Sequence, residues 1–265
     1  MKKYRKPYRV KRKKSIFRNR FLWSGILIFI FITSSLYFLF FSEIFQVEKI
    51  IVTGEKKVSK IDLELLVKEK LEKETFFLKT RSIFLVNLNE IKENILNSFP
   101  QIAEIEISRG FPDTLNVVVV ERFCLTIWCQ EGQCFLLDNE GVIFEEIFDF
   151  DSKTFQVKNL AQVPELKLGD KVIEKEKLNQ ILNIESRLED NLKIPVIAVA
   201  LVSEERLNVE TSEGWEIYFN PQGNIEWQLT KLGAVLEEEI LPENRKNLEY
   251  IELRFGNFAN PKYKD

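Results

Sequence analysis

Residues 99–122 read FPQIAEIEISRGFPDTLNVVVVER, and this stretch decides the fold of the first half of the chain. Side chains alternate in character over 102–109, and 114–121 includes four consecutive valines, so both segments are predicted strands. The four residues between them, 110–113, read GFPD and are typical of a turn. We therefore expect two strands joined by a tight connection.

A further strand and two helices are predicted upstream of this stretch. Residues 47–54, VEKIIVTG, form a β-branched run that ends at a glycine, which is typical of a strand followed by a turn. Ser59 is a suitable N-cap for a first helix, and a second helix begins after Asn87 and stops before Pro100. The predicted order is β-α-α-β-β.

Downstream of Arg122 the pattern is mainly β. Two helices, near 174–190 and 225–239, interrupt it with apolar residues at helical spacing. For these stripes, packing into a core is the simplest interpretation. The predicted strands lie at 123–129, 134–138, 142–145, 196–202, 207–211, 215–219 and 250–255.

Residues 21–41, FLWSGILIFIFITSSLYFLFF, contain no charge. At about 1.5 Å per residue such a helix is roughly 31 Å long, which matches the ~30 Å hydrocarbon core of a bilayer. A cleaved signal peptide usually has a shorter apolar region and a cleavage site of small residues. The exit from this stretch, FFSEIF at 40–45, shows no such site. A retained membrane span is therefore favoured.

The charges divide around this span. Of the 38 basic and 41 acidic side chains, eleven basic ones and no acid lie in residues 1–20, and the other 27 basic and all 41 acidic ones follow Ser42, a net charge of −14. A basic segment can bind nucleic acid, but next to a span it more simply holds the N-terminus in the cytoplasm. We expect a single-pass protein of the cytoplasmic membrane whose residues 43–265 lie outside.

The chemistry of known enzyme classes finds little support. The sequence has no histidine, which excludes Ser-His-Asp and Cys-His catalysis and every His-ligated metal centre. The glycine spacings of nucleotide-binding loops are absent, as is the S-x-x-K motif of acyl transfer. Carboxylate pairs such as Glu145 with Glu146, or Glu237 to Glu239, leave open a membrane-anchored cell-wall hydrolase. With 41 acids in the chain, however, such pairs arise by chance.

Three cysteines, Cys124, Cys129 and Cys134, recur at equal spacing. A zinc site would need a fourth ligand, and the spacing matches no common zinc pattern. Cys129 and Cys134 flank a predicted hairpin loop at 130–133, where cross-strand Cβ separations approach those of a disulfide. We expect a Cys129–Cys134 disulfide, preserved by an oxidising exterior, with Cys124 buried or unpaired.

Taken in order, these segments resemble the FtsQ/DivIB family of cell division proteins. The resemblance is carried by the basic tail and single span, by 47–54, by the 99–122 block, by LLDNEGVIF at 136–144 and by YIELRFGNFA at 250–259. The 99–122 block is the most specific segment, and it looks like the last two strands of the family's POTRA domain. Three features depart from the family pattern. Phe123 and Cys124 replace the usual proline after the Glu-Arg pair, the cysteine hairpin is unusual, and the final motif is one or two residues shorter around Gly256, which leaves the register of the last strand open.

The resemblance implies a non-enzymatic scaffold of the bacterial division machinery. Such a protein binds FtsB-like and FtsL-like partners outside the membrane and links them to septal wall synthesis. The resemblance implies no cofactor, metal, nucleic acid or small-molecule substrate, and it implies enrichment at the division septum. It also implies that residues 46–121, the POTRA-like domain, help to recruit the protein to the septum, since exposed strand edges can pair with an incoming chain.

Partner binding is expected on the last predicted strand, 250–255. As the final strand it is expected at a sheet edge, where a partner segment can add by strand pairing. Alternation places Tyr250, Glu252 and Arg254 on one face, and Ile251, Leu253 and Phe255 inward. Tyr250 offers an aromatic anchor and Arg254 a charge for a partner carboxylate. The resemblance points to the Arg254–Phe255 pair within the L-R-F motif, so we expect Tyr250, Glu252, Arg254 and Phe255 to bind the partner.

The expected architecture is α+β. A single N-terminal transmembrane helix precedes a POTRA-like β-α-α-β-β domain and then a mainly antiparallel β domain with flanking helices. The predicted boundaries are a basic tail at 1–20, the span at 21–42, the POTRA-like domain at 46–121, the β domain at 122–258 and a short tail at 259–265.

Overall fold

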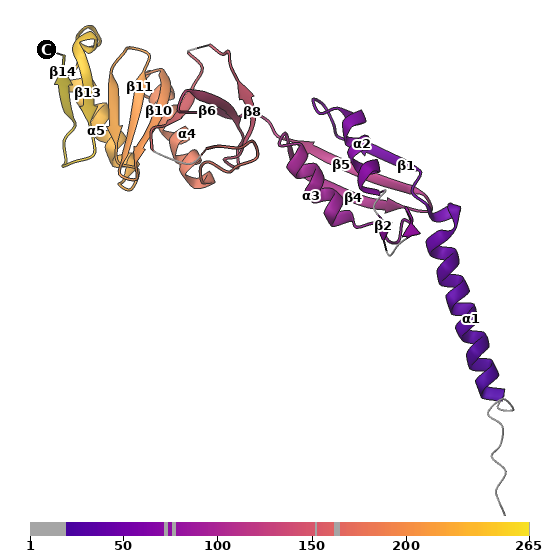
Figure 1. The fold of residues 1–265 in the computed structure, drawn as a ribbon. Helices are drawn as coiled ribbons and strands as arrows, with labels where there is room; N and C mark the ends of the chain where they lie inside the picture. Colours follow the sequence, from indigo (N-terminus) through magenta and orange to yellow (C-terminus); the bar gives the residue numbers. More distant parts are fainter. Residues whose placement is uncertain (1–19, 72–73, 76–77, 152, 162–164, 265) are drawn as a thin grey trace, which may run out of the picture. The chain divides into compact units, whose positions relative to one another are not determined.

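The computed structural model describes residues 20–71, 74–75, 78–151, 153–161 and 165–264 (Figure 1). The predicted basic tail therefore lies outside the described residues, apart from Arg20. Helix α1 (Arg20–Phe41) corresponds to the apolar stretch. Within the described part of the chain it is the one helix long and apolar enough to cross a membrane. A short 3-10 helix, η2 (Glu43–Phe45), follows it.

The next elements are β1 (Lys49–Thr53), α2 (Lys60–Leu71), α3 (Leu88–Ser98), β4 (Ile102–Gly110) and β5 (Thr114–Glu121). They confirm the predicted β-α-α-β-β order. A short hairpin was not predicted; its two strands, β2 (Glu74–Thr75) and β3 (Leu78–Lys79), have two residues each. The three-stranded sheet has the order β1-β5-β4, with β1 parallel to β5. The buried side chains of this region include Val52, Leu63, Val67, Ile91, Ile95, Leu115 and Val117.

Glu121, at the end of β5, organises the connection between β1 and α2. Its carboxylate accepts the backbone N–H groups of Lys56, Lys57 and Val58 at 2.6–3.0 Å. Burial alone would raise the pKa of Glu121, but these three donors outweigh it and the pKa lies below its ordinary value. The connection begins at Gly54 with φ of 92°, where a Cβ atom would lie 2.2 Å from the Val119 carbonyl oxygen. Only glycine fits there.

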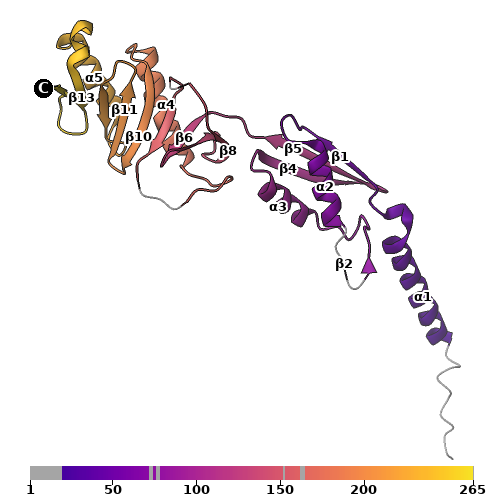
Figure 2. The same cartoon turned by 45° about the horizontal axis from the view of Figure 1, so that its top comes forward.

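A nine-stranded sheet contains the remaining strands, in the order β14-β13-β12-β11-β10-β9-β6-β7-β8. The chain divides into two compact units that are interleaved in sequence: 54–59, 93–105 and the residues from 119 onward belong to one unit, and the other residues belong to the second. Figures 1 and 2 show the C-terminal strands at one end of this sheet and β8 at the other. Its strands are β6 (Thr126–Gln130), β7 (Gln133–Leu137), β8 (Ile143–Ile147), β9 (Gln156–Asn159), β10 (Val196–Ser203), β11 (Arg206–Thr211), β12 (Glu216–Phe219), β13 (Leu248–Glu252) and β14 (Asn260–Tyr263).

Most neighbours in this sheet are antiparallel, as predicted, while β9 pairs in parallel with both β6 and β10, and β12 in parallel with β13. The structure thus confirms the predicted α+β class. Strand β9 was not predicted, because its four residues QVKN carry a single β-branched side chain. Strand β14 is a correction, since the predicted 259–265 tail contains a paired strand.

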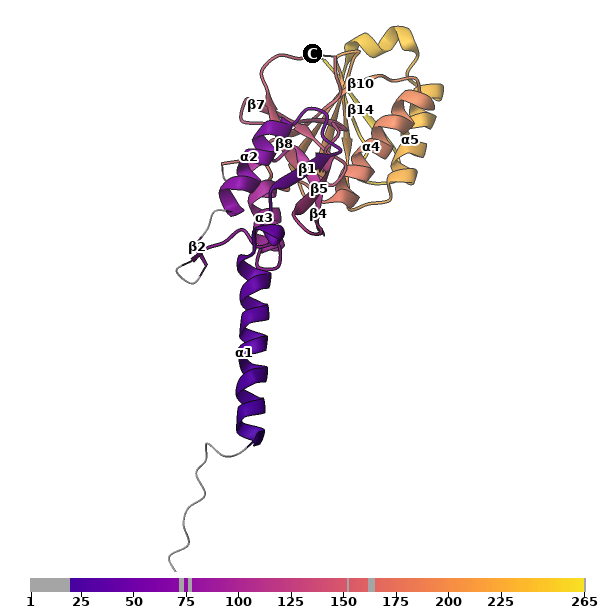
Figure 3. The same ribbon diagram turned by 90° about the vertical axis from the view of Figure 1, so that its right-hand side faces the viewer.

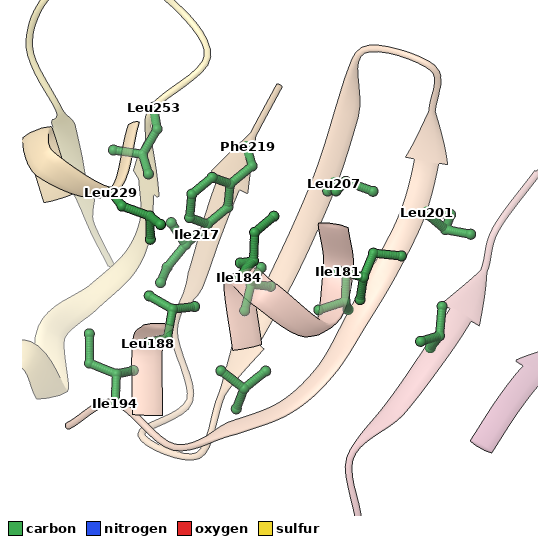
Figure 4. Packing of buried hydrophobic residues seen from close by; sticks show 14 of the residues in the cluster. Ile181, Ile184, Leu188, Ile194, Leu201, Leu207, Ile217, Phe219, Leu229 and Leu253 are labelled. Carbon is green, nitrogen blue, oxygen red and sulfur yellow. The ribbon is translucent and has the colours of Figure 1, made fainter. Parts of the chain in front are cut away.

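Helices α4 (Lys175–Asp190) and α5 (Ile225–Glu238) lie on the same side of the nine-stranded sheet (Figure 3). Asn224 caps α5 by accepting the Trp227 N–H at 3.0 Å. The apolar stripes of both helices pack on alternate residues of the strands. Figure 4 shows this core around Ile181, Ile184, Leu188, Leu207, Leu229, Ile217 and Phe219. Packing was the predicted role of the stripes, and Leu178, Ile181, Ile184 and Leu188 form the buried face of α4.

Arg122 follows Glu121 and connects the end of β5 to the turn after β7. Its guanidinium forms an ion pair with Asp138 and donates to the Pro100 carbonyl oxygen at 3.0 Å. Asp138 is 2% exposed and also accepts the backbone N–H of Val142 at 2.8 Å. A buried carboxylate needs such donors, because an unpaired charge is costly to bury. The Glu-Arg pair of the 99–122 block is thus explained by two separate sets of contacts. Glu121 accepts backbone N–H groups after β1, and Arg122 pairs with Asp138 and the Pro100 carbonyl oxygen.

Candidate functional site

The C-terminal edge of the nine-stranded sheet differs from the prediction. Strand β13 ends at Glu252, and the chain turns at Gly256 and returns as β14, which pairs antiparallel with β13. The segment 250–255 is therefore an inner strand and its exit, not an edge. The prediction was wrong because Pro261 and the charged residues around it lack the usual strand pattern. A proline is nevertheless tolerated on an edge strand.

Strand β14 is the edge, and the hydrogen-bond pattern fixes which of its backbone groups point outward. Lys264 donates its backbone N–H to the Asn247 carbonyl oxygen at 2.8 Å. Along an extended strand the backbone groups alternate in direction, so those of Lys262 also point toward β13. Those of Pro261 and Tyr263 point away from the sheet. The outer edge of β14 therefore offers the N–H and carbonyl of Tyr263 and the carbonyl of Pro261.

The predicted alternation holds from Tyr250 to Arg254 and fails at Phe255. Ile251 and Leu253 are fully buried, while Tyr250 and Glu252 are half-buried on the opposite face. Phe255 was predicted to point inward, yet it is 62% exposed. The reason is that the strand has already ended and the chain is turning.

A cluster of aromatic and charged side chains covers the face of β12 and β13 opposite the helices. The rings of Tyr218 and Tyr250 stack with centroids 4.4 Å apart. The Arg206 guanidinium lies 4.2 Å above the Tyr218 ring, and that of Arg254 lies 5.9 Å from it. We call Arg206, Tyr218, Tyr250, Glu252 and Arg254 the Tyr218–Tyr250 cluster. Burial, followed by the nearby Glu216 carboxylate, raises the pKa of Tyr218 to about 12, so its phenol stays protonated at neutral pH.

Within this cluster Arg254 is already paired. Its Nε and Nη2 atoms donate to the two carboxylate oxygens of Glu252 at 2.9 and 2.6 Å. Burial of Glu252 would raise its pKa, but the hydrogen bonds from Arg254 outweigh this effect and lower it. The prediction of an Arg254 free for a partner carboxylate therefore needs correction: the guanidinium has an intramolecular partner, and both side chains remain partly exposed.

Sequence reasoning missed two contributors to this site. Lys231 of α5 reaches through to the turn after β13 and donates to the carbonyl oxygens of Leu253 and Gly256 at 2.7 and 3.1 Å. Burial lowers its pKa. Tyr218 lies more than thirty residues before Tyr250 and meets it only because β12 and β13 are neighbours. The position of Lys231 on the apolar stripe of α5 could have indicated its buried role, whereas no local sequence feature identified Tyr218.

At the β6–β7 hairpin the structure joins Cys129 and Cys134 in a disulfide, with Cα atoms 4.2 Å apart. The connecting loop is shorter than predicted. Glu131 and Gly132, with φ of 51° and 84°, form a two-residue turn, and Gln130 and Gln133 belong to the strands. The two cysteines then occupy a non-hydrogen-bonded pair, where strands approach most closely. Cys124 has a free thiol and is exposed rather than buried.

The carboxylates raised as possible catalytic groups do not face one another. Glu145 and Glu146 are neighbours on β8, so their side chains point to opposite faces of the sheet. Residues 237–239 at the end of α5 are exposed. In the described residues no group of three or more Cys, Asp or Glu side chains is arranged to hold a metal ion. The site therefore offers binding chemistry: an open strand edge beside an aromatic and charged face.

Comparison with known families gives two matches. The family model "POTRA domain, FtsQ-type" matches residues 45–122. The family model "Cell division protein FtsQ/DivIB, C-terminal" matches residues 126–254. Together they cover the three-stranded sheet and the strands of the nine-stranded sheet from β6 to β13.

Several curated proteins are similar over parts of the chain. Cell division protein FtsQ of Rickettsia bellii is 33% identical over 97 residues, which cover 37% of this chain and 33% of that protein. FtsQ of Rickettsia prowazekii is 29% identical over 140 residues, 52% of this chain and 48% of that protein. Cell division protein DivIB of Clostridium tetani is 28% identical over 85 residues, 32% of each. The matched segments span less than half the length of each of these relatives.

Proposed function

The chain belongs to the FtsQ/DivIB family of cell division proteins, and we propose that it is a non-enzymatic scaffold that binds FtsB-like and FtsL-like partners outside the cytoplasmic membrane. The scaffold connects these partners to septal wall synthesis and is enriched at the septum. In this proposal the N-terminus is cytoplasmic, because the eleven basic residues of 1–20 precede the span.

The observation that carries this proposal is the open edge of β14. An extended segment of an FtsB-like protein adds there as a tenth strand, with its backbone bonded to Tyr263 and Pro261. The Tyr218–Tyr250 cluster lies on the neighbouring strands and supplies side-chain selectivity, since tyrosine and arginine are among the residue types enriched at binding hot spots. The predicted partner residues Tyr250, Glu252, Arg254 and Phe255 stay in the proposal, as the face and corner beside the edge.

A substitution that removes one backbone donor tests this proposal. Tyr263→Pro deletes the outward N–H and leaves the ladder to β13 intact. The partner carbonyl then stays unpaired, which costs about 1–3 kcal/mol, so binding should weaken about tenfold or more. Tyr263→Ala is the matched control, because it removes the ring and keeps the N–H.

The measurement is the affinity of the full chain, in nanodiscs, for the FtsB-like and FtsL-like proteins of the same organism. Tyr263→Pro should bind far more weakly than Tyr263→Ala. Equal affinities for the two variants would remove strand addition at β14 from the proposal. Release of soluble fragments from peptidoglycan by the full chain would instead favour the alternative, a wall hydrolase.

A further inference from the structure

A row of aromatic rings, half-buried at Phe45 and exposed at its far end, leads away from the C-terminal end of α1. Phe45 contacts Phe38 of the helix, with ring centroids 6.2 Å apart. Phe84 lies 5.3 Å from Phe45, and Phe111 lies 5.5 Å from Phe84. We call Phe45, Phe84 and Phe111 the aromatic row. Phe111 is 62% exposed and Phe84 38%.

Hydrogen bonds to backbone carbonyl groups hold this row against the end of the helix. Ile83 donates its N–H to the Phe45 carbonyl oxygen at 2.9 Å. The Thr80 hydroxyl donates to the Phe40 carbonyl oxygen at 2.9 Å, and that of Ser82 to the Leu39 carbonyl oxygen at 3.4 Å. These are carbonyls of the last helical turn, which have no partner within the helix. The segment around Phe84 is therefore tied to the residues where α1 ends.

The two loops that carry Phe84 and Phe111 are also held from behind. The Arg109 guanidinium donates to the carbonyl oxygens of Ile83 and Val86 at 2.7 and 2.9 Å, which fixes the loop on both sides of Phe84. Asp113 forms an ion pair with Lys49 at 3.0 Å, and its carbonyl oxygen accepts the N–H of Glu48 at 2.9 Å. These contacts hold the two loops so that the rings of Phe84 and Phe111 face outward. A contiguous exposed apolar surface is unfavourable in water and marks an interaction site.

We propose that the aromatic row, with Ile44 and Leu85 beside it, inserts into the headgroup and acyl boundary of the same bilayer that α1 crosses. Ile44 and Leu85 are 56% and 42% exposed, and they extend the apolar surface. The occupant is lipid because the row is continuous, ring by ring, with the membrane-spanning helix. Interfacial segments bury apolar side chains about 5–10 Å into this boundary. The inference takes from the proposed function only that α1 spans a membrane.

The test uses nitroxide labels on the full chain in nanodiscs of phosphatidylethanolamine and phosphatidylglycerol. Single cysteines at Phe84→Cys and Phe111→Cys are labelled in a Cys124→Ser background. Collision with oxygen, which concentrates in lipid, is compared with collision with a water-soluble nickel chelate. Ile61→Cys is the matched control. Ile61 is also apolar and 76% exposed, but it lies in α2, beyond the far end of β1.

Labels at 84 and 111 should collide several-fold more with oxygen relative to nickel than the label at 61. If all three labels behave alike, or if those at 84 and 111 are shielded from both reagents as under a protein partner, the inference is wrong. A label at Phe31, in the middle of α1, separates the two proposals. Lipid contact at 31 with water contact at 84 and 111 rejects the insertion and leaves the membrane span standing. Circular dichroism of each variant verifies the fold.

Discussion

Arg254 illustrates how one side chain can serve the fold and a partner together. In the free protein its fork is satisfied by both oxygens of Glu252, and its plane lies near the rings of Tyr218 and Phe255. An arginine has five donors, so a partner carboxylate can bind without breaking this pair. The ion pair with Glu252 then positions the Arg254 guanidinium and leaves it donors for a partner.

Arg254→Glu should weaken binding of the FtsB-like partner by several-fold to a hundredfold. Loss of a desolvated charge pair costs roughly 2–5 kcal/mol, and loss of a pair at the rim costs much less. The single variant also places two carboxylates side by side, so it disturbs the internal pair as well. Calorimetric titration of the variant with the partner measures the change.

The exchanged variant, Glu252→Arg with Arg254→Glu, separates the two roles. It rebuilds the internal pair with the charges reversed. If Arg254 meets a partner carboxylate, the exchanged variant binds as weakly as Arg254→Glu. Recovery of wild-type affinity would show that the residue acts only inside its own chain.

At the scale of elements, α5 holds the turn between β13 and β14 through one buried lysine. Lys231→Met should lower the free energy of unfolding by about 1–3 kcal/mol, since the carbonyls of Leu253 and Gly256 lose their donor. Urea unfolding measures the loss. Glu237→Met, on the exposed side of the same helix, is the control and should change stability little. If both variants are equally stable, the lysine does not hold the turn.

The β6–β7 hairpin gives a second prediction at this scale. Mass mapping under non-reducing, thiol-blocked conditions should find Cys129 joined to Cys134 and only Cys124 alkylated. Replacing both bridged cysteines by serine should cost about 2 kcal/mol, because a bridge over five residues restricts a short loop of the unfolded chain. Cys124→Ser serves as the control. Three alkylated cysteines in the native protein would contradict the pairing.

Periodic elements could be predicted from the sequence closely. The predicted helices 174–190 and 225–239 differ from α4 and α5 by a single residue each. Their apolar stripes are long enough for the period to be unambiguous. Strands β9 and β14 were missed, and each has only four residues. Strand β9 pairs with β6 and β10, which are distant in sequence, whereas β14 contains Pro261 and lacks the usual strand pattern. Local propensity carries no record of such pairings.

The candidate site was predicted in part for the same reason. Tyr250 and Glu252 were placed on the correct face, because alternation within one strand is a local property. The stacking partner Tyr218, the supporting Lys231 and the true edge β14 depend on which strands become neighbours. That order is set by packing of the whole sheet, and no single segment encodes it.

At the scale of the whole molecule, we propose that the POTRA-like domain has a recruiting role that can be separated from partner binding. Its sheet ends in β1 and β4, two edges that can accept an incoming chain. Deleting 46–121, with the span and the nine-stranded sheet retained, should reduce septal localisation of a fluorescent fusion. The variant should still bind the FtsB-like partner in a pull-down, which shows that the rest has folded. Unchanged localisation would remove the recruiting role from this domain.

Pro261 has a consequence for how the protein behaves when many copies gather. Proline has no backbone N–H. The outer edge of β14 therefore offers one donor, the N–H of Tyr263, and two acceptors, the carbonyl oxygens of Pro261 and Tyr263. If the outer edges of two β14 strands faced each other, they would have too few N–H donors for their carbonyl groups. Pairing of two copies through this edge is thereby disfavoured, while a partner strand with free N–H groups can still bind. One imino acid thus disfavours self-association at the edge where we propose that the partner adds.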